Sequence, residues 1–109
     1  MEKKTEVILR QIIDFITSVN SYKEGKTFAN FQNNEMMQDA VLRKLELIGE
    51  AIKRLPDNFI QEHSSLPLKE AIAVRNRLIH EYDDIDLKII WDTINVDLPM
   101  LLTDLKEIL

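Results

Sequence analysis

One stretch of the chain, residues 75–82, carries most of the groups that could do chemistry. It contains the guanidinium of Arg75, the carboxamide of Asn76, the imidazole of His80 and the phenol of Tyr82. An arginine fork binds a phosphate through two hydrogen bonds and stabilises charge that develops on it. A histidine with a pKa near neutral takes a proton from a hydroxyl or gives one to a leaving oxygen. These two groups suffice for metal-free cleavage of RNA, in which the neighbouring 2′-hydroxyl is the nucleophile.

The other two groups have roles that fit the same chemistry. Asn76 could orient His80 or hold a phosphate oxygen, and Tyr82 could stack on a base or donate a hydrogen bond. A purely structural interpretation competes with this one. In that interpretation, the arginine and histidine at a helix end only pair with nearby acidic residues, namely Glu81, Asp83 and Asp84. Residue spacing alone does not decide between the two.

The spacing within the stretch sets a geometric condition on any site. Asn76 and His80 are four residues apart, so a helix places them on one face. Arg75 and His80 are five apart, which is about 140° around an ideal helix. They converge only if the helix ends near His80 or if a second subunit completes the site.

The elements that must position these groups are helices, because apolar residues recur every three or four positions. The pattern predicts helices over residues 4–22, from Glu35 to Arg54, from Pro67 to His80, and from Asp86, as the cap, to Ile108. Pro99 lies inside the last of these and predicts a kink. We therefore expect an all-α fold, an antiparallel bundle of four main helices plus short helical turns. Such a bundle leaves apolar surface for a symmetric partner, which predicts a homodimer.

Composition limits the class of protein. At 109 residues, 45% hydrophobic and 30% charged, the chain fits one soluble globular domain over residues 1–109. With no cysteine, thiolate zinc sites and cysteine nucleophiles are excluded, and the cytoplasm is the simplest compartment. We expect no membrane-spanning segment, no bound metal and no cofactor. The net charge of −5 argues against a broad basic surface for nucleic acid, so any RNA contact should be local.

The residues of the central stretch also resemble a known family. Arg75, His80 and Tyr82 match the pattern of the HEPN superfamily, in which four residues separate the arginine from the histidine and one residue separates the histidine from the tyrosine. The wider sequence is similar to the HepT-like branch, in phrases that cover residues 38–46, 48–51, 53–56, 74–82, 85–87 and 97–99. The likeness follows the chain order over essentially its whole length. The acidic pair Asp83-Asp84 is a departure, since relatives often have an aromatic residue and a glycine there.

The resemblance implies a metal-independent endoribonuclease toxin that forms a homodimer with both motifs facing a shared cleft. Arg75 and His80 would be catalytic with Asn76 in support, and RNA would be the substrate. The partner would be a minimal nucleotidyltransferase antitoxin, which would silence the toxin by transferring AMP to Tyr82. The alternative function is a non-catalytic helical, nucleotide-binding partner subunit of such a nucleotidyltransferase. The acidic net charge favours this alternative slightly, and the intact set of motif groups favours the nuclease.

Overall fold

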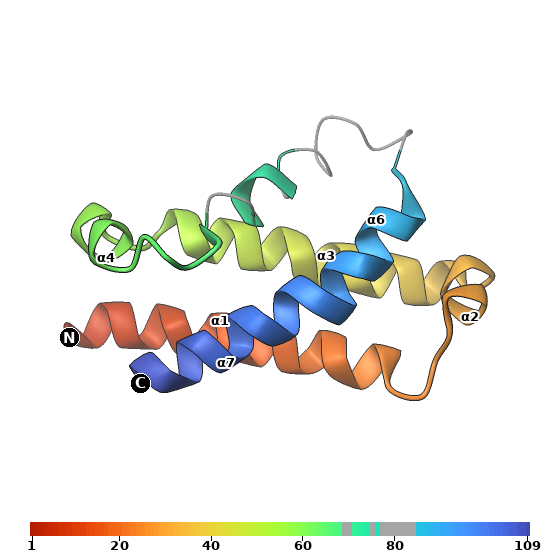
Figure 1. Cartoon of the computed structure of the whole chain (residues 1–109), viewed down its shortest axis with the longest axis horizontal. Coiled ribbons are helices and arrows are strands. Elements are labelled where there is room, and N and C mark those ends of the chain that lie inside the picture. The colour runs from red at the N-terminus through yellow and green to blue at the C-terminus, as the bar shows by residue number, and fades with distance from the viewer. Residues whose placement is uncertain (69–70, 75, 77–84) are drawn as a thin grey trace.

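The computed structural model describes residues 1–68, 71–74, 76 and 85–109 (Figure 1). The regular structure of these residues is all helical, so the predicted all-α class is confirmed for them. The helices are α1 (Lys3–Lys23), α2 (Phe28–Gln32), α3 (Glu35–Lys53), α4 (Asp57–Glu62), α6 (Leu87–Asp92), the π-helical turn η2 (Thr93–Asp97) and α7 (Leu98–Ile108).

The two longest helices, α1 and α3, lie side by side and run in opposite directions (Figure 1). Each buries the stripe that its apolar spacing predicts, Ile8, Ile12, Ile16 and Val19 on α1, and Val41, Leu45, Ile48 and Ile52 on α3. Burying one such side chain fully contributes about 1.5–3 kcal/mol. Just past the end of α1, Gly25 adopts φ 70°, a left-handed conformation in which a glycine avoids the Cβ penalty. The pair forms the frame on which the other helices pack.

Helix α2 occupies the segment where the sequence predicts a short turn with phenylalanines in the core. The Thr27 hydroxyl accepts from the Asn30 N–H at 3.1 Å, and the Asn30 side chain accepts from the Thr27 N–H at 2.9 Å, which is a complete capping box. Phe31 is fully buried, and Phe28 packs against the core with partial exposure. Asn34 then caps α3 by accepting from the Met37 N–H at 3.0 Å. The predicted cap and the predicted buried phenylalanine are therefore present.

The C-terminal helical run differs from the prediction of one long helix with a kink at Pro99. It is divided into α6, η2 and α7, and the irregular turn lies just before the proline. In this turn the N–H of Leu98 bonds to the carbonyl of Thr93, five residues back. Pro99 has no N–H to donate, and its ring would clash with the carbonyl four residues earlier in a regular helix. The wider turn accommodates the proline without ending the helical run.

The predicted third main helix begins as expected. Leu68 is buried, and the Ala71 N–H bonds to the carbonyl of Pro67 at 3.2 Å. Residues 71–74 and 76 are helical, with Ile72 and Val74 packed against the core. The rest of this helix lies outside the described residues, so the antiparallel bundle of four main helices stays a prediction.

Candidate functional site

Of the four residues that the sequence predicts for the site, the structure describes one. Asn76 lies in the helix that starts after Pro67, and it is partly exposed. Arg75, His80 and Tyr82 lie outside the described residues. Their convergence therefore stays a prediction, and the structure shows instead how the chain is anchored on either side of them.

On the N-terminal side, the anchor is a short apolar face. Leu68 is 2% exposed, and Ile72 and Val74 contact the same core that α1 and α3 build. Leu68 and Ile72 are four residues apart and lie on one face of the helix, whereas Val74 lies about 200° around the helix from Ile72. Asn76 follows Val74 by two residues, about 200° around the helix, so it lies away from Val74 on the circumference. Asn76 therefore lies on the side of the helix that carries Leu68 and Ile72, and the contacts of these apolar residues with the core fix the helix at this point.

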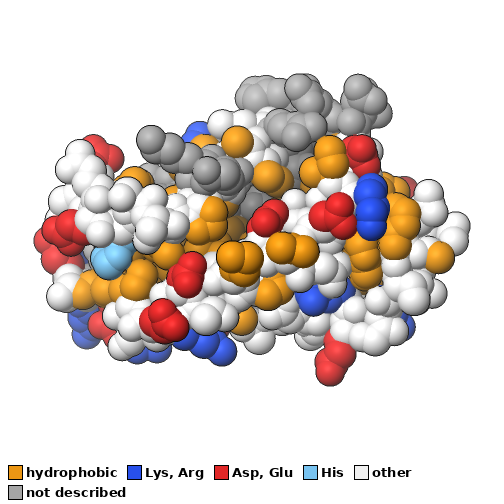
Figure 2. Space-filling model, viewed as in Figure 1, with side chains coloured by type: hydrophobic (Ala, Val, Ile, Leu, Met, Phe, Trp, Pro, Cys, Tyr) orange, Lys and Arg blue, Asp and Glu red, His pale blue; other side chains and the backbone are white. Residues whose placement is uncertain are grey.

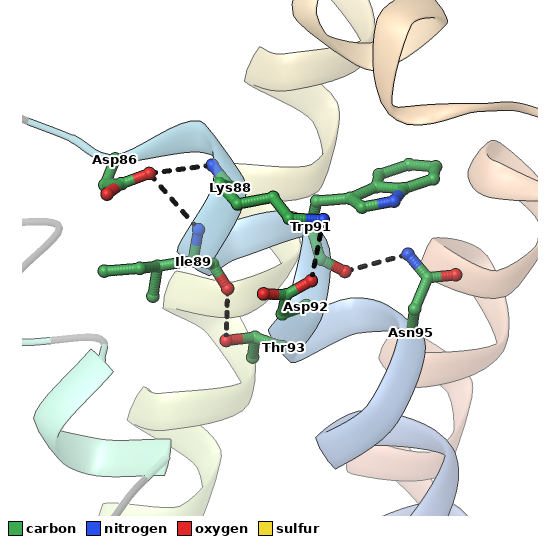
Figure 3. Close-up of polar contacts among 7 residues, drawn as sticks. All are labelled: Asp86, Lys88, Ile89, Trp91, Asp92, Thr93 and Asn95. Carbon is green, nitrogen blue, oxygen red and sulfur yellow. Dashed lines mark hydrogen bonds and ion pairs between the residues drawn. The ribbon is translucent and has the colours of Figure 1, made fainter.

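On the C-terminal side, the anchor is the start of α6 (Figure 3). The Asp86 carboxylate accepts from the backbone N–H of Lys88 at 2.9 Å and of Ile89 at 3.4 Å, as the sequence predicts for a cap. Ile85, just before the cap, packs against the core, and Ile90 is buried, which are the positions of a hydrophobic staple. The chain after the motif thus enters α6 at a defined point.

An aromatic contact holds α6 against α2. The ring of Trp91 lies 5.4 Å from the ring of Phe31 and 6.4 Å from that of Phe28, centroid to centroid. The ammonium of Lys88 lies 5.1 Å from the Phe28 ring and 3.3 Å from the Asp92 carboxylate. Aromatic pairs at such separations add about 0.5–1.5 kcal/mol beyond the area they bury. These contacts give the segment after the motif a rigid support.

A small apolar cavity of about 140 Å³ adjoins the helix that leads into the motif. Ala71 and Val74 form one wall, and the facing walls come from α3 and α7. Thr93 and Asp97, the two ends of the π-helical turn, supply its polar part. The apolar spacing did not predict this cavity, although a proline within a helical pattern signals an irregular turn at this point.

The second histidine, His63, follows α4, and its ring stacks on Phe59 with centroids 4.4 Å apart. It lines an open crevice of about 620 Å³ together with Asp57 and two serines, Ser64 and Ser65. Among these described side chains no hydrogen bond or ion pair joins the histidine to the carboxylate or to a hydroxyl. A nucleophilic triad requires those bonds, so the residue types alone do not make one.

The outer side of the C-terminal run carries exposed apolar residues, Ile89, Val96 and Met100, with exposures of 41%, 54% and 62%. We refer to these three residues as the outer stripe. Figure 2 shows hydrophobic side chains interspersed with acidic ones over the region that α6 and α7 occupy in Figure 1. In sequence the outer stripe is interleaved with Asp92 and Asp97, which are also exposed.

The described part of the chain has neither a helix that could span a membrane nor a cluster of metal-binding side chains. Its helices include none that is long and apolar enough to cross a membrane. Within the same residues, no three histidine, aspartate or glutamate side chains gather at a position where they could hold a metal ion.

Comparison with known proteins points to one family. Residues 12–108 match the family described as "Ribonuclease HepT-like". The chain is 43% identical over 86 residues to "Putative RNase" of Caldanaerobacter subterraneus subsp. tengcongensis, covering 79% of this chain and 77% of that one. It is 33% identical over 101 residues to "Probable ribonuclease HepT" of Thermococcus cleftensis, covering 93% and 92%.

A third relative has a second part. The chain is 35% identical over its full 109 residues to "Gamma-glutamylcyclotransferase and putative RNase" of Methanocaldococcus jannaschii, and it spans 49% of that protein's length. No solved structure matches the chain.

Proposed function

Because the chain belongs to the HepT-like ribonuclease family, we propose that it is a metal-independent endoribonuclease that uses Arg75 and His80, supported by Asn76. The observation that carries the proposal is the family match, which spans residues 12–108 and includes the whole motif. The anchored segments on both sides of the motif support it, because a fixed scaffold is what a catalytic stretch needs.

The proposed reaction needs only an internal nucleophile and two protein groups. The imidazole of His80 removes the proton from a 2′-hydroxyl, and the freed oxygen attacks the adjacent phosphorus. The bond from phosphorus to the 5′-oxygen breaks, and that oxygen leaves with the proton that the His80 imidazolium gives back. The guanidinium of Arg75 pairs with the phosphate oxygens, where negative charge grows in the transition state. The products are a 2′,3′-cyclic phosphate and a 5′-hydroxyl end.

We place this activity in a toxin–antitoxin pair that acts in the cytoplasm. The partner is a minimal nucleotidyltransferase that transfers AMP to the Tyr82 hydroxyl. The added phosphate carries negative charge and the adenosine is bulky, and Tyr82 is only two residues from His80. The modification would compete with substrate phosphate for the arginine fork.

The working form in this proposal is a homodimer. The separation of about 140° between Arg75 and His80 on one helix is overcome when groups from two chains meet across a two-fold axis. The outer stripe supports a homodimer, because several exposed apolar residues along one helical run mark an interaction surface, whereas single exposed ones do not. We therefore take the outer stripe as part of the dimer interface.

The direct test is incubation of the purified protein with RNA in EDTA. We expect cleavage to continue, and we expect mass spectrometry of the fragments to find 2′,3′-cyclic phosphate ends. Intact RNA, with or without added Mg²⁺, would reject the nuclease and favour the non-catalytic nucleotide-binding subunit. That second function is favoured only by the net charge of −5, which is unusual for a protein that binds RNA.

A further inference from the structure

The cavity beside the motif helix has the size of a single six-membered ring. Its volume is about 140 Å³, and an apolar protein cavity of about 150 Å³ binds benzene. A fused purine ring system is larger than benzene, so it fits less well. Ala71, Val74 and Leu101 present aliphatic surface to the space, and such side chains contact the flat faces of a base. Size and wall chemistry therefore suit a pyrimidine ring.

The polar part of the cavity accepts hydrogen bonds. The carboxylate of Asp97 is an acceptor, and the structure gives it no hydrogen bond or ion pair within the described part of the chain. The hydroxyl of Thr93 already donates to the Ile89 carbonyl at 2.8 Å, so its remaining capacity is also as an acceptor (Figure 3). A ligand that matches both must carry a donor on its edge.

Among the pyrimidines, this favours an exocyclic amino group. Cytosine has an N4 amino donor, and pairing of aspartate or glutamate with that amino group is a recognised form of base readout. Uracil has an oxygen at the same ring position and a single N–H on this edge, so it supplies one donor where the amino group of cytosine supplies two. The discrimination follows from the unpaired acceptor and not from shape.

The local backbone explains why the acceptors stand at the cavity. Thr93 and Asp97 are the first and last residues of the π-helical turn, whose wider winding is fixed by the missing N–H of Pro99. Single π turns within α-helices are frequent at functional sites. On the opposite wall, Val74 immediately precedes Arg75 in sequence. A base held in the cavity would thus be bound by the helix that carries the motif.

We propose that this cavity is a base-binding pocket for cytosine, which selects the RNA nucleotide bound next to the catalytic stretch. The proposal rests on the ribonuclease function proposed above and adds a substrate preference to it. Asp97 is in this account a specificity residue and takes no part in the bond-breaking step.

The test measures binding of free nucleosides, which carry no phosphate and are not cleaved. Cytidine, uridine and adenosine are titrated into the ¹⁵N-labelled protein and followed by amide NMR shifts. We expect cytidine to shift the amide signals of Thr93, Val96 and Asp97. Adenosine should bind most weakly and cause the smallest shifts. In Asp97→Asn, cytidine affinity should fall about tenfold, because a neutral carboxamide oxygen accepts a weaker hydrogen bond than a carboxylate does. The preference over uridine should be lost, because a carboxamide can donate to the uracil oxygen.

Two control variants test whether cytidine binds in the cavity. Asp104→Asn removes one carboxylate from α7, outside the cavity, and should bind cytidine as the unsubstituted protein does. Ala71→Leu fills the space with side chain and should abolish nucleoside binding, with folding checked by circular dichroism.

The outcomes separate this proposal from the nuclease itself. Equal affinity for cytidine and uridine, or cytidine binding that persists in Ala71→Leu, would overturn the pocket. RNA cleavage without any nucleoside binding would also overturn it and leave the nuclease standing. Selective cytidine binding in a protein that does not cut RNA would support the pocket and reject the nuclease.

Discussion

The cap of α6 gives a prediction whose size can be worked out from the structure. Asp86→Ala removes the acceptor for the N–H of Lys88 at 2.9 Å and of Ile89 at 3.4 Å. The second bond is long, so the loss should be that of one good cap bond, about 1 kcal/mol within a range of about 0.5–2. Urea slopes of about 1–3 kcal/mol/M convert 1 kcal/mol into a midpoint shift of about 0.3–1 M. We expect that shift at fixed protein concentration, with an unchanged slope.

The matched variant is Asp86→Asn, which keeps an acceptor oxygen and caps about as well as aspartate. It should unfold within a few tenths of a kcal/mol of the unsubstituted protein. If the asparagine variant loses as much stability as the alanine variant, Asp86 stabilises α6 through its charge rather than through the cap hydrogen bond. If neither variant loses stability, the described start of α6 is wrong.

Three further predictions address the core, the assembly and the control of the protein. Phe31→Ala should destabilise by about 3–5 kcal/mol because the ring is fully buried, whereas Phe28→Ala, at a partly exposed ring, should cost less in the same urea titration. Met100→Glu places a charge on the outer stripe and should halve the mass measured by light scattering, whereas Met36→Glu, at a still more exposed methionine on α3, should leave the mass unchanged. A monomeric unsubstituted protein at micromolar concentration would reject the dimer. Tyr82→Phe should keep its nuclease activity in the presence of partner, ATP and Mg²⁺, and a silenced phenylalanine variant would show that the label lies elsewhere.

The sequence predicted the fold class and most helix boundaries because the apolar spacing of α1 and α3 is regular, a glycine follows α1 and a cap precedes α3. Asn33 or Asn34 was expected as the cap of α3 and Asp86 as that of α6, and Asn34 and Asp86 accept the bonds. The irregular turn before Pro99 was placed at the proline itself, since a pattern of side chains does not report how the backbone distributes the strain of a missing N–H. Residue type is a limit as well, since the adjacent methionines Met36 and Met37 are 79% and 8% exposed.

The residues of the candidate site were predictable from the motif, but their arrangement in space was not. Arg75, His80 and Tyr82 share a short stretch, but whether they converge depends on where their helix ends and on a second chain, and neither is encoded in residue spacing. The cavity lined by Thr93 and Asp97 was not predictable either. It forms between segments far apart in sequence, and only their packing against Ala71 and Val74 creates it.

The central claim is that Arg75 and His80 perform RNA cleavage, and single-turnover kinetics in EDTA test it most directly. His80→Ala should lower the cleavage rate by about 10²–10⁴, the usual contribution of a general acid or base. Arg75→Ala should lower it by about 10²–10³ through loss of transition-state charge stabilisation. Both variants should unfold at the same urea concentration as the unsubstituted protein. Cleavage at the unsubstituted rate by both folded variants would contradict the account.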